Sequence, residues 1–232
     1  MKTLGIIGGV GPESTIDYYK NIIALYRERT ANGSYPQFVI NSIDLQKGID
    51  FLEANDLSGM AAFLLEEIEK LPKAGAEFGI IAANTPHIVF DEVSAKSSIP
   101  LISIVKAACE YAKARKLKRL ALFGTRYTMK ADFYQKVFAR EGIDLVAPEA
   151  KDQDYIHDKY FAELVPGSFL PETRAGLFAI VDRMKSEAEI EGVVLAGTEL
   201  ALILRGENHN GVALLDTGKI HCHAAVTEML SG

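Results

Sequence analysis

Short apolar runs alternate with amphipathic helical patterns throughout the sequence. Several runs, including 5–7, 79–81 and 193–195, are continuously apolar, which is typical of strands covered on both faces. Strands are predicted at residues 3–7, 37–43, 78–82, 101–104, 119–123, 143–147, 192–196 and 212–216. Because parallel strands need crossover helices between them, this pattern predicts an α/β fold with mainly parallel sheets.

Two of the intervening helices carry recognisable boundary signals. Apolar residues recur at helical spacing over 16–26, after Pro12 and before Gly33. A second pattern runs over 64–71, with Ser58 as a possible N-cap.

A weak internal repeat indicates that the chain has two similar halves. The strand-plus-glycine corner at 4–9 recurs at 120–125, so that Gly8 and Gly124 lie 116 residues apart (124 − 8), and Ala83 and Gly197 lie 114 apart (197 − 83). We expect two α/β lobes related by a pseudo-twofold axis, with a ligand cleft between them at the carboxyl ends of the strands. The predicted lobes are 1–103 plus 206–232, and 104–205. The alternative is the chance periodicity of any α/β protein.

Composition excludes several classes of function. The net charge is −6 and no Lys/Arg cluster is present, which argues against nucleic acid as a partner. No apolar run approaches the roughly 20 residues that span a bilayer, so no membrane partner is expected. We expect a cytoplasmic protein.

The two cysteines give no sign of disulfide, nucleophilic or metal chemistry. Cys109 shares an apolar helical face with its neighbours, which favours a small buried hydrophobe. Cys222 stands between two histidines at 221–223, but adjacent residues of a helix point in different directions, and the segment continues with apolar spacing. No metal site is predicted.

A glycine-rich corner at 8–14 joins the first predicted strand to a helix. Gly9 and Gly11 would let a ligand approach the backbone, and the N–H groups of a helix N-terminus favour an anion. The spacing differs from the dinucleotide fingerprint, so that cofactor is not expected. A tight structural turn is the alternative.

Polar side chains follow two further predicted strands, in 82–85 and 196–199. Asn84 and Thr85 can donate hydrogen bonds to a carboxylate, or can cap the helix that follows. Thr198 can donate from the other lobe. Glu199 can bind an ammonium group or hold Thr198 and its loop in place, and we favour the second role.

Three more residues carry chemistry that ordinary structure also explains. His87 is a possible proton carrier, although a partly buried histidine bonded to the backbone is the preferred interpretation. Lys47 and Lys159 offer positive charge near strand ends, and a solvated helix face is the alternative for both.

Taken together and in this order, the motifs resemble those of aspartate/glutamate racemases over nearly the whole chain. The motifs that carry the resemblance are Gly5-Ile6-Ile7-Gly8-Gly9-Val10-Gly11-Pro12-Glu13, Asn84-Thr85-Pro86-His87, Phe123-Gly124-Thr125, Tyr155-Ile156-His157, Thr198-Glu199, Leu215-Asp216-Thr217 and Ile220-His221. The resemblance implies two lobes, a site without a cofactor, acidic amino acids as ligands and a homodimer.

The resemblance also implies roles for individual residues. Asn84, Thr85, Thr125 and Thr198 would hold the substrate carboxylates. Lys159 would pair with the side-chain carboxylate, and Lys47 is a looser match. The corner at Gly9 and Gly11 completes the expected binding set.

The sequence departs from the family pattern at two decisive positions. The family uses two facing cysteines to remove and return the α-proton, and Ala83 and Gly197 stand in their places. Losing two acid–base groups, each contributing on the order of 10² to 10⁴ in rate, would abolish racemisation by that route. Thr85, Thr198, His87 and His157 stand near the vacant positions.

Three explanations of this departure stay open. In the first, the chain uses other groups to isomerise, decarboxylate or eliminate. In the second, it only binds an amino acid or dicarboxylate. In the third, it is an engineered inactive variant. Our leading hypothesis is a racemase-family protein that acts on an acidic amino acid such as aspartate or glutamate.

Overall fold

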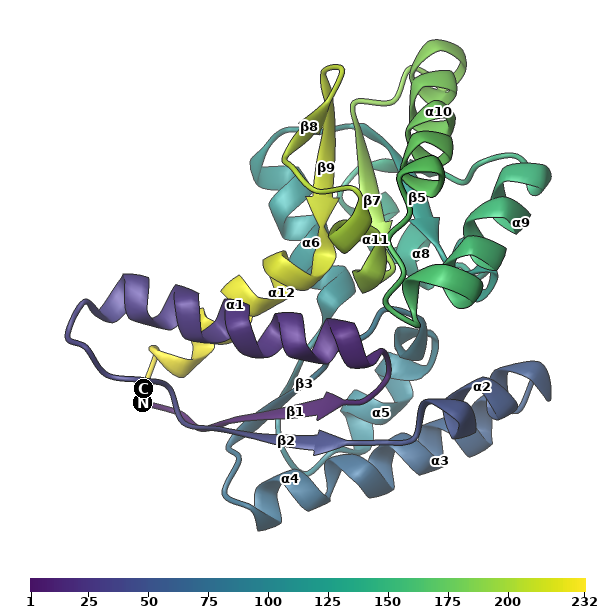
Figure 1. Cartoon of the computed structure of the whole chain (residues 1–232). Coiled ribbons are helices and arrows are strands. Elements are labelled where there is room, and N and C mark those ends of the chain that lie inside the picture. Colours follow the sequence, from purple (N-terminus) through teal and green to yellow (C-terminus); the bar gives the residue numbers. More distant parts are fainter. The chain divides into compact units, whose positions relative to one another are not determined.

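Strand pairing divides the chain into two units, each built around its own sheet (Figure 1). The computed structural model describes all 232 residues. The first unit contains Met1–Ile104 and Gly218–Gly232, and the second contains Val105–Thr217. Both sheets are mainly parallel, which confirms the predicted α/β fold class.

The sheet of the first unit has the strand order β2-β1-β3-β4 and is wholly parallel. Its strands are β1 (Leu4–Gly8), β2 (Phe38–Ser42), β3 (Phe78–Ile81) and β4 (Leu101–Ile102). Its helices are α1 (Pro12–Thr30), α2 (Leu45–Glu53), α3 (Leu57–Ile68), α4 (Lys70–Lys73), the 3₁₀ turn η1 (Thr85–Val89), α5 (Phe90–Lys96) and α12 (Thr217–Met229). The first residue of α12 belongs to the second unit.

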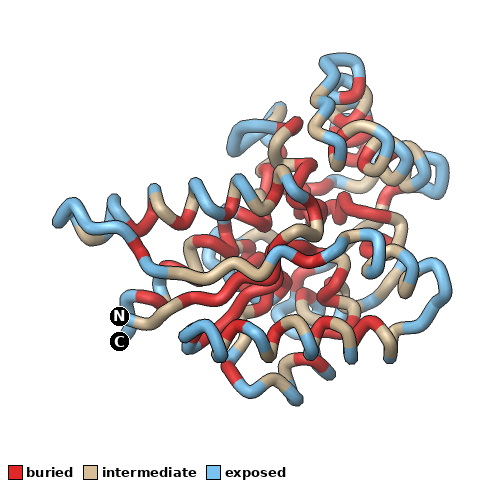
Figure 2. The backbone as a smooth tube through the Cα atoms, turned by 60° about the horizontal axis from the view of Figure 1, so that its bottom comes forward, coloured by how far each residue is buried: buried red, intermediate tan, exposed pale blue.

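Both faces of this first sheet are covered, as the continuous apolar strands predict. Leu4 and Ile6 pack with α1 and α12, whereas Ile7 packs with α3 and α5 on the other face. The central strands β1 and β3 are buried, whereas the edge strands β2 and β4 are mostly of intermediate burial, and Figure 2 shows exposed residues along the outer faces of the helices. This arrangement follows from the alternation of side chains across a strand.

The sheet of the second unit has the order β6-β5-β7-β9-β8. Its parallel strands are β5 (Arg119–Gly124), β6 (Asp144–Val146), β7 (Gly192–Ala196) and β9 (Val212–Asp216), and β8 (Asn208–His209) pairs antiparallel with β9. Its helices are α6 (Ile104–Ala114), α7 (Arg126–Lys130), α8 (Phe133–Arg140), α9 (Ala150–Lys159), the π-helical turn η2 (Tyr160–Leu164), α10 (Pro171–Ala188) and α11 (Thr198–Ile203). The first residue of α6 belongs to the first unit.

Apart from β8, the two sheets have the same topology. The order β2-β1-β3-β4 matches β6-β5-β7-β9, strand for strand. This agreement supports the internal repeat and places Ala83 and Gly197 after equivalent strands, β3 and β7.

Three expectations need correction. The strand at 212–216 was assigned to the first lobe, but β9 pairs with β7 in the second unit, where it occupies the position that β4 has in the first. The short strand β8 was not anticipated. Ser58 does not cap α3, because the N-cap is Asp56, which accepts from the N–H of Gly59 and from the Ser58 hydroxyl.

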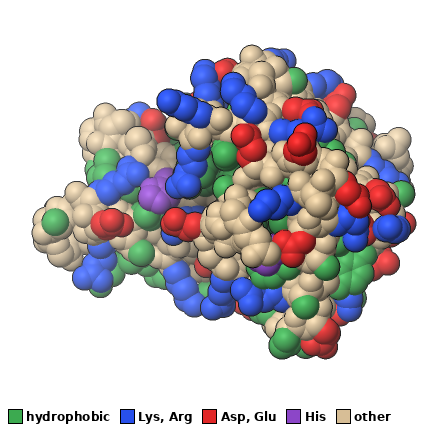
Figure 3. Space-filling view, turned by 90° about the horizontal axis from the view of Figure 1, so that it is seen from above, with side chains coloured by type: hydrophobic (Ala, Val, Ile, Leu, Met, Phe, Trp, Pro, Cys, Tyr) green, Lys and Arg blue, Asp and Glu red, His purple; other side chains and the backbone are tan.

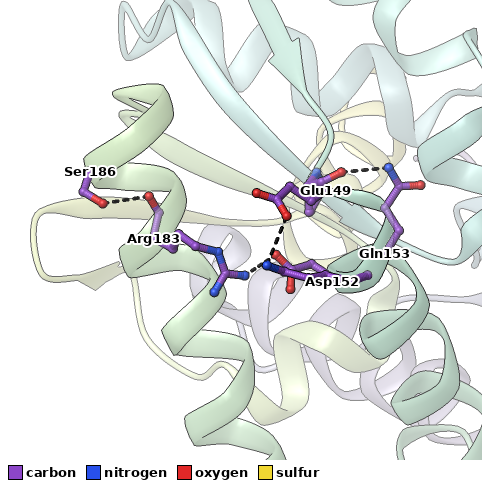
Figure 4. A network of polar contacts seen from close by, with 7 residues as sticks. Glu149, Asp152, Gln153, Arg183 and Ser186 are labelled. Atoms are coloured by element: carbon purple, nitrogen blue, oxygen red, sulfur yellow. Dashed lines mark hydrogen bonds and ion pairs between the residues drawn. The ribbon is translucent and has the colours of Figure 1, made fainter.

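An ion pair joins two helices of the second unit (Figure 4). Arg183 of α10 binds the carboxylate of Asp152 on α9, and Gln153 donates from its side chain to the carbonyl of Pro148. These contacts fix α9, which leads directly into η2.

The surface carries charges of both signs. In the view of Figure 3, Lys and Arg side chains lie among Asp and Glu side chains. No helix combines the length and the apolar character needed to cross a membrane.

Candidate functional site

Each unit brings two of the predicted strand ends together. In the first unit β1 and β3 are neighbours, and the N–H of Ala82 donates to the carbonyl of Ile7 at 2.9 Å. In the second unit β5 and β7 are neighbours, and Gly124 is paired with Ala196. The segments that start at Gly9 and Ala83 therefore share one sheet edge, as do those that start at Thr125 and Gly197.

The glycine corner is a tight turn with internal hydrogen bonds. Gly9 has φ +81°, and a Cβ there would overlap the carbonyl of Ile43. The N–H of Gly9 donates to the Thr15 hydroxyl at 2.9 Å, which in turn donates to the carbonyl of Gly11 at 3.0 Å. These contacts support the structural alternative for Gly9, because its N–H already has a protein partner.

His87 fixes the backbone at the end of β3. The N–H of Ile104 donates to its Nε2 at 3.2 Å, so Nδ1 carries the hydrogen and donates to the carbonyl of Ala83 at 2.9 Å. Burial lowers the pKa of His87 to about 3, and Phe90 stacks on the ring with centroids 4.7 Å apart. The preferred interpretation of His87 as a backbone-bonded histidine agrees with the structure, and the ring stays neutral at physiological pH.

Asn84 and Thr85 follow Ala83 at the start of η1. Asn84 is buried, and its side chain makes no capping hydrogen bond to η1, which argues against capping as its role. Thr85 is half-buried. Behind them, the hydroxyl of Ser14 in α1 donates to the carbonyl of Ala82 at 3.2 Å and ties the strand end to the helix.

Thr125 caps a helix at the end of β5. Its side chain accepts from the N–H of Thr128 at 3.2 Å and is buried. The next residue, Arg126, donates its N–H to Nδ1 of His157 at 3.2 Å. Burial, and then the charge of Arg126, lower the pKa of His157. The implied carboxylate contact of Thr125 remains a prediction.

Two hydroxyl groups converge on Glu199 at the end of β7. The hydroxyl of Thr198 donates to its Oε2 at 2.9 Å, and the phenol of Tyr160 donates to the same oxygen. Both Glu199 and Thr198 are buried. This geometry agrees with the preferred role of Glu199, which is to hold Thr198 and its loop.

The two candidate lysines differ in their surroundings. Lys159 forms an ion pair with Glu163, one turn further along, and that carboxylate raises its pKa. Glu163 also accepts from the hydroxyl of Thr173. Lys47 lies exposed on α2, with its ammonium 5.8 Å from the ring centroid of Phe63.

Both cysteines and His221 are buried, whereas His223 is only partly buried. Cys109 is buried, and burial, followed by the charge of Glu141, raises the pKa of its thiol to about 11. Cys222 packs in the core of the first unit. His221 donates from Nε2 to the carbonyl of Ile102 and accepts at Nδ1 from Tyr18, both at 3.0 Å.

Sequence reasoning missed Tyr160, which contacts both Gly197 and Glu199. The available signal was the glycine itself, because Gly197 directly follows an apolar strand and precedes a helix. Its partner lies on a distant helical segment, and spacing alone does not reveal it.

The chain is an α/β protein of two units, each with a mainly parallel sheet whose central strands lead into small and polar residues. A model of the Asp/Glu/hydantoin racemase family matches residues 7–225, and the chain belongs to this family. This confirms the family resemblance.

Three relatives illustrate the match. The chain is 24% identical over 205 residues to the broad-specificity amino-acid racemase RacX of Bacillus subtilis (strain 168), and the matched residues cover 87% of each protein. It is 28% identical to a putative Asp/Glu racemase from Yersinia pestis, with a TM-score of 0.89 and 100% of both chains covered. It is 34% identical to an aspartate racemase homologue from Pyrococcus horikoshii OT3, with a TM-score of 0.84 and the same coverage.

Proposed function

We propose that this protein acts on an acidic amino acid such as aspartate or glutamate, without a cofactor and without the two-thiol mechanism of its family. One observation carries the proposal: equivalent strands of the two units end in Ala83-Asn84-Thr85 and Gly197-Thr198-Glu199. In each segment a residue that has no proton to move precedes a buried side chain that can donate a hydrogen bond to a carboxylate, Asn84 in one and Thr198 in the other.

The binding residues in this proposal are those that the family resemblance implies. Asn84, Thr85, Thr125 and Thr198 hold the carboxylates, and Lys159 pairs with the carboxylate of the substrate side chain. Glu199 keeps Thr198 in place. Lys47 and the corner at Gly9 and Gly11 belong to the proposed set with less structural support, since the Gly9 N–H is already bonded.

Ala83 and Gly197 mark the positions of the family's acid–base groups, and neither can carry a proton. His87 does not replace them, because both ring nitrogens bond to the backbone and its pKa is low. Thr85, Thr198 and His157 are the nearby polar groups left for the reaction. A slow, non-cysteine proton exchange at the α-carbon is the expected activity.

The experiment measures α-proton exchange together with binding. Aspartate and glutamate are incubated with the protein in D₂O, loss of the α-proton signal is followed by NMR, and affinity is measured by calorimetry. We expect binding and slow exchange, with Asn84→Ala weakening the affinity at least tenfold and the exposed Ser58→Ala leaving it unchanged. The proposal would be refuted if the protein bound neither aspartate nor glutamate.

A second candidate is a binding protein without catalysis. The neutral, backbone-bonded His87 beside Ala83 favours it, because this strand end then offers no titrating group near neutral pH. Tight binding with no exchange would select this function, and release of CO₂ or of ammonia would instead select a lyase.

We also propose that the protein is a cytoplasmic homodimer, as its family resemblance implies. Light scattering after size-exclusion chromatography tests the assembly. A mass near the 25.3 kDa of one chain would contradict it.

A further inference from the structure

Gly197 is a glycine for reasons of space and not of backbone conformation. Its φ of −148° and ψ of 117° are extended values that any residue adopts. A Cβ at this position would lie 2.7 Å from Cε2 and 3.3 Å from Cζ of Tyr160. Real Cβ atoms do not approach a ring carbon this closely, so a side chain at 197 and this placement of Tyr160 exclude each other.

Tyr160 is firmly held in this position. Its side chain is buried in the core of the second unit, and its ring contacts Phe161 edge-on with centroids 5.5 Å apart. Its phenol donates to Glu199, while burial and then the Glu199 carboxylate raise its pKa well above the ordinary value. The phenol therefore stays protonated and remains a donor to Glu199.

The local backbone supports the same arrangement. Tyr160 is the first residue of the π-helical turn η2, an irregularity that is frequent at functional sites. Glu199 lies in the first turn of α11, next to Thr198, whose hydroxyl donates to the same carboxylate oxygen. One ring thus connects η2, the end of β7 and the start of α11.

We propose that Tyr160 is a positioning residue at the end of β7: its ring takes the space of a side chain at 197, and its phenol positions Glu199 and, through it, Thr198. This inference rests on the proposed function for the role of Thr198 in binding. In this chain the space at the end of β7 is therefore filled by the ring of Tyr160 and not by a side chain on residue 197.

The first experiment tests whether the Tyr160 ring excludes a side chain at 197. It compares the Tm change caused by Gly197→Ala in chains that carry Tyr160, Tyr160→Phe or Tyr160→Leu. With Tyr160 present, we expect the substitution to lower Tm by about 4 to 8 °C, because overpacking is costly. The same loss is expected with Tyr160→Phe, which keeps the ring. Tyr160→Leu removes both Tyr160 atoms and leaves only Leu200 Cδ1 at 3.3 Å, the far end of a flexible side chain, so Gly197→Ala is expected to be close to neutral in this background. An equal loss of Tm in all three backgrounds would overturn the inference.

Aspartate affinity tests the positioning part. We expect Tyr160→Phe to raise the Kd about fivefold to tenfold, because Glu199 loses a donor and Thr198 loses its fixed orientation. Tyr155→Phe is the matched control: the Tyr155 hydroxyl also packs against a glycine, Gly176, but Tyr160 and not Tyr155 donates to Glu199. An unchanged Kd in Tyr160→Phe, or an equal rise in the control, would contradict the positioning role.

The two proposals fail separately. If the native protein binds neither aspartate nor glutamate, the proposed function is wrong, while the thermal comparison still decides whether Tyr160 and Gly197 form one steric unit. Restoration of both thiols gives an independent check. Racemisation in Ala83→Cys with Gly197→Cys while Tyr160 is retained would overturn the inference, and racemisation only after adding Tyr160→Leu would support it.

Discussion

At the end of β3 a histidine holds the main chain of Ala83, whereas at the end of β7 a tyrosine ring fills the side-chain space of Gly197. Ala83 already has a Cβ, so a cysteine there adds a single sulfur atom. At Gly197 the first atom of any side chain conflicts with Tyr160. Ala83 and Gly197 occupy equivalent places in the topology but differ in the room for a side chain. The backbone of Ala83 is held by His87, whereas the space beside Gly197 is filled by Tyr160.

The largest expected effect comes from removing the histidine. His87→Ala deletes a buried ring and leaves the N–H of Ile104 and the carbonyl of Ala83 without their partner. We expect a loss of about 3 to 5 kcal/mol in the free energy of unfolding, measured with urea. Tyr160→Phe, which loses one hydrogen bond and keeps its ring, should lose only about 1 to 2 kcal/mol. Equal losses would break the contrast between the two strand ends.

An effect of intermediate size concerns the pH dependence of stability, which further distinguishes the strand end at His87 from the one at Tyr160. His87 and His221 have pKa values of about 3 and about 4 when folded, because burial disfavours their charged forms. An unfolded histidine titrates near 6.5, so below that pH the unfolded chain binds more protons and stability falls. Each histidine contributes a loss of about 1.4 kcal/mol per pH unit between pH 6.5 and its folded value, and none above pH 6.5.

His87→Gln isolates this contribution. Urea unfolding at pH 6.5 and pH 5 should show the variant losing about 2 kcal/mol less than the native protein over this interval. Tyr160→Phe should keep the native pH slope. The same slope in native protein and His87→Gln would contradict a neutral, buried His87.

The smallest expected effect tests how locally Tyr160 is held. Arg183→Met removes the ion pair with Asp152 that joins α10 to α9. Because the Arg183 side chain is partly exposed, whereas that of Asp152 is nearly buried, we expect a loss of about 1 kcal/mol, reduced further by salt. The fall in Tm caused by Gly197→Ala should remain the same in this background. A smaller fall would show that the ion pair of α9 and α10 helps to fix the tyrosine.

The sequence predicted every strand except β8, because each of the others is a short, mainly apolar run, whereas β8 consists of Asn208 and His209. It did not place β9, since an apolar run identifies a strand but not its neighbours in a sheet. The family was identified from the order of the strand-end motifs. His87 was correctly interpreted as a backbone-bonded histidine, whereas the contact between Tyr160 and Gly197 was missed because it depends on three-dimensional packing.

The overlap between Tyr160 and any Cβ at residue 197 constrains the order in which substitutions can accumulate. A chain with a side chain at 197 cannot accept this tyrosine placement until that side chain is lost. Once the tyrosine is present, reversion at 197 alone meets a steric barrier, and the return path must begin at 160. The glycine and the tyrosine therefore depend on each other, and a side chain at 197 is tolerated only after a substitution at 160.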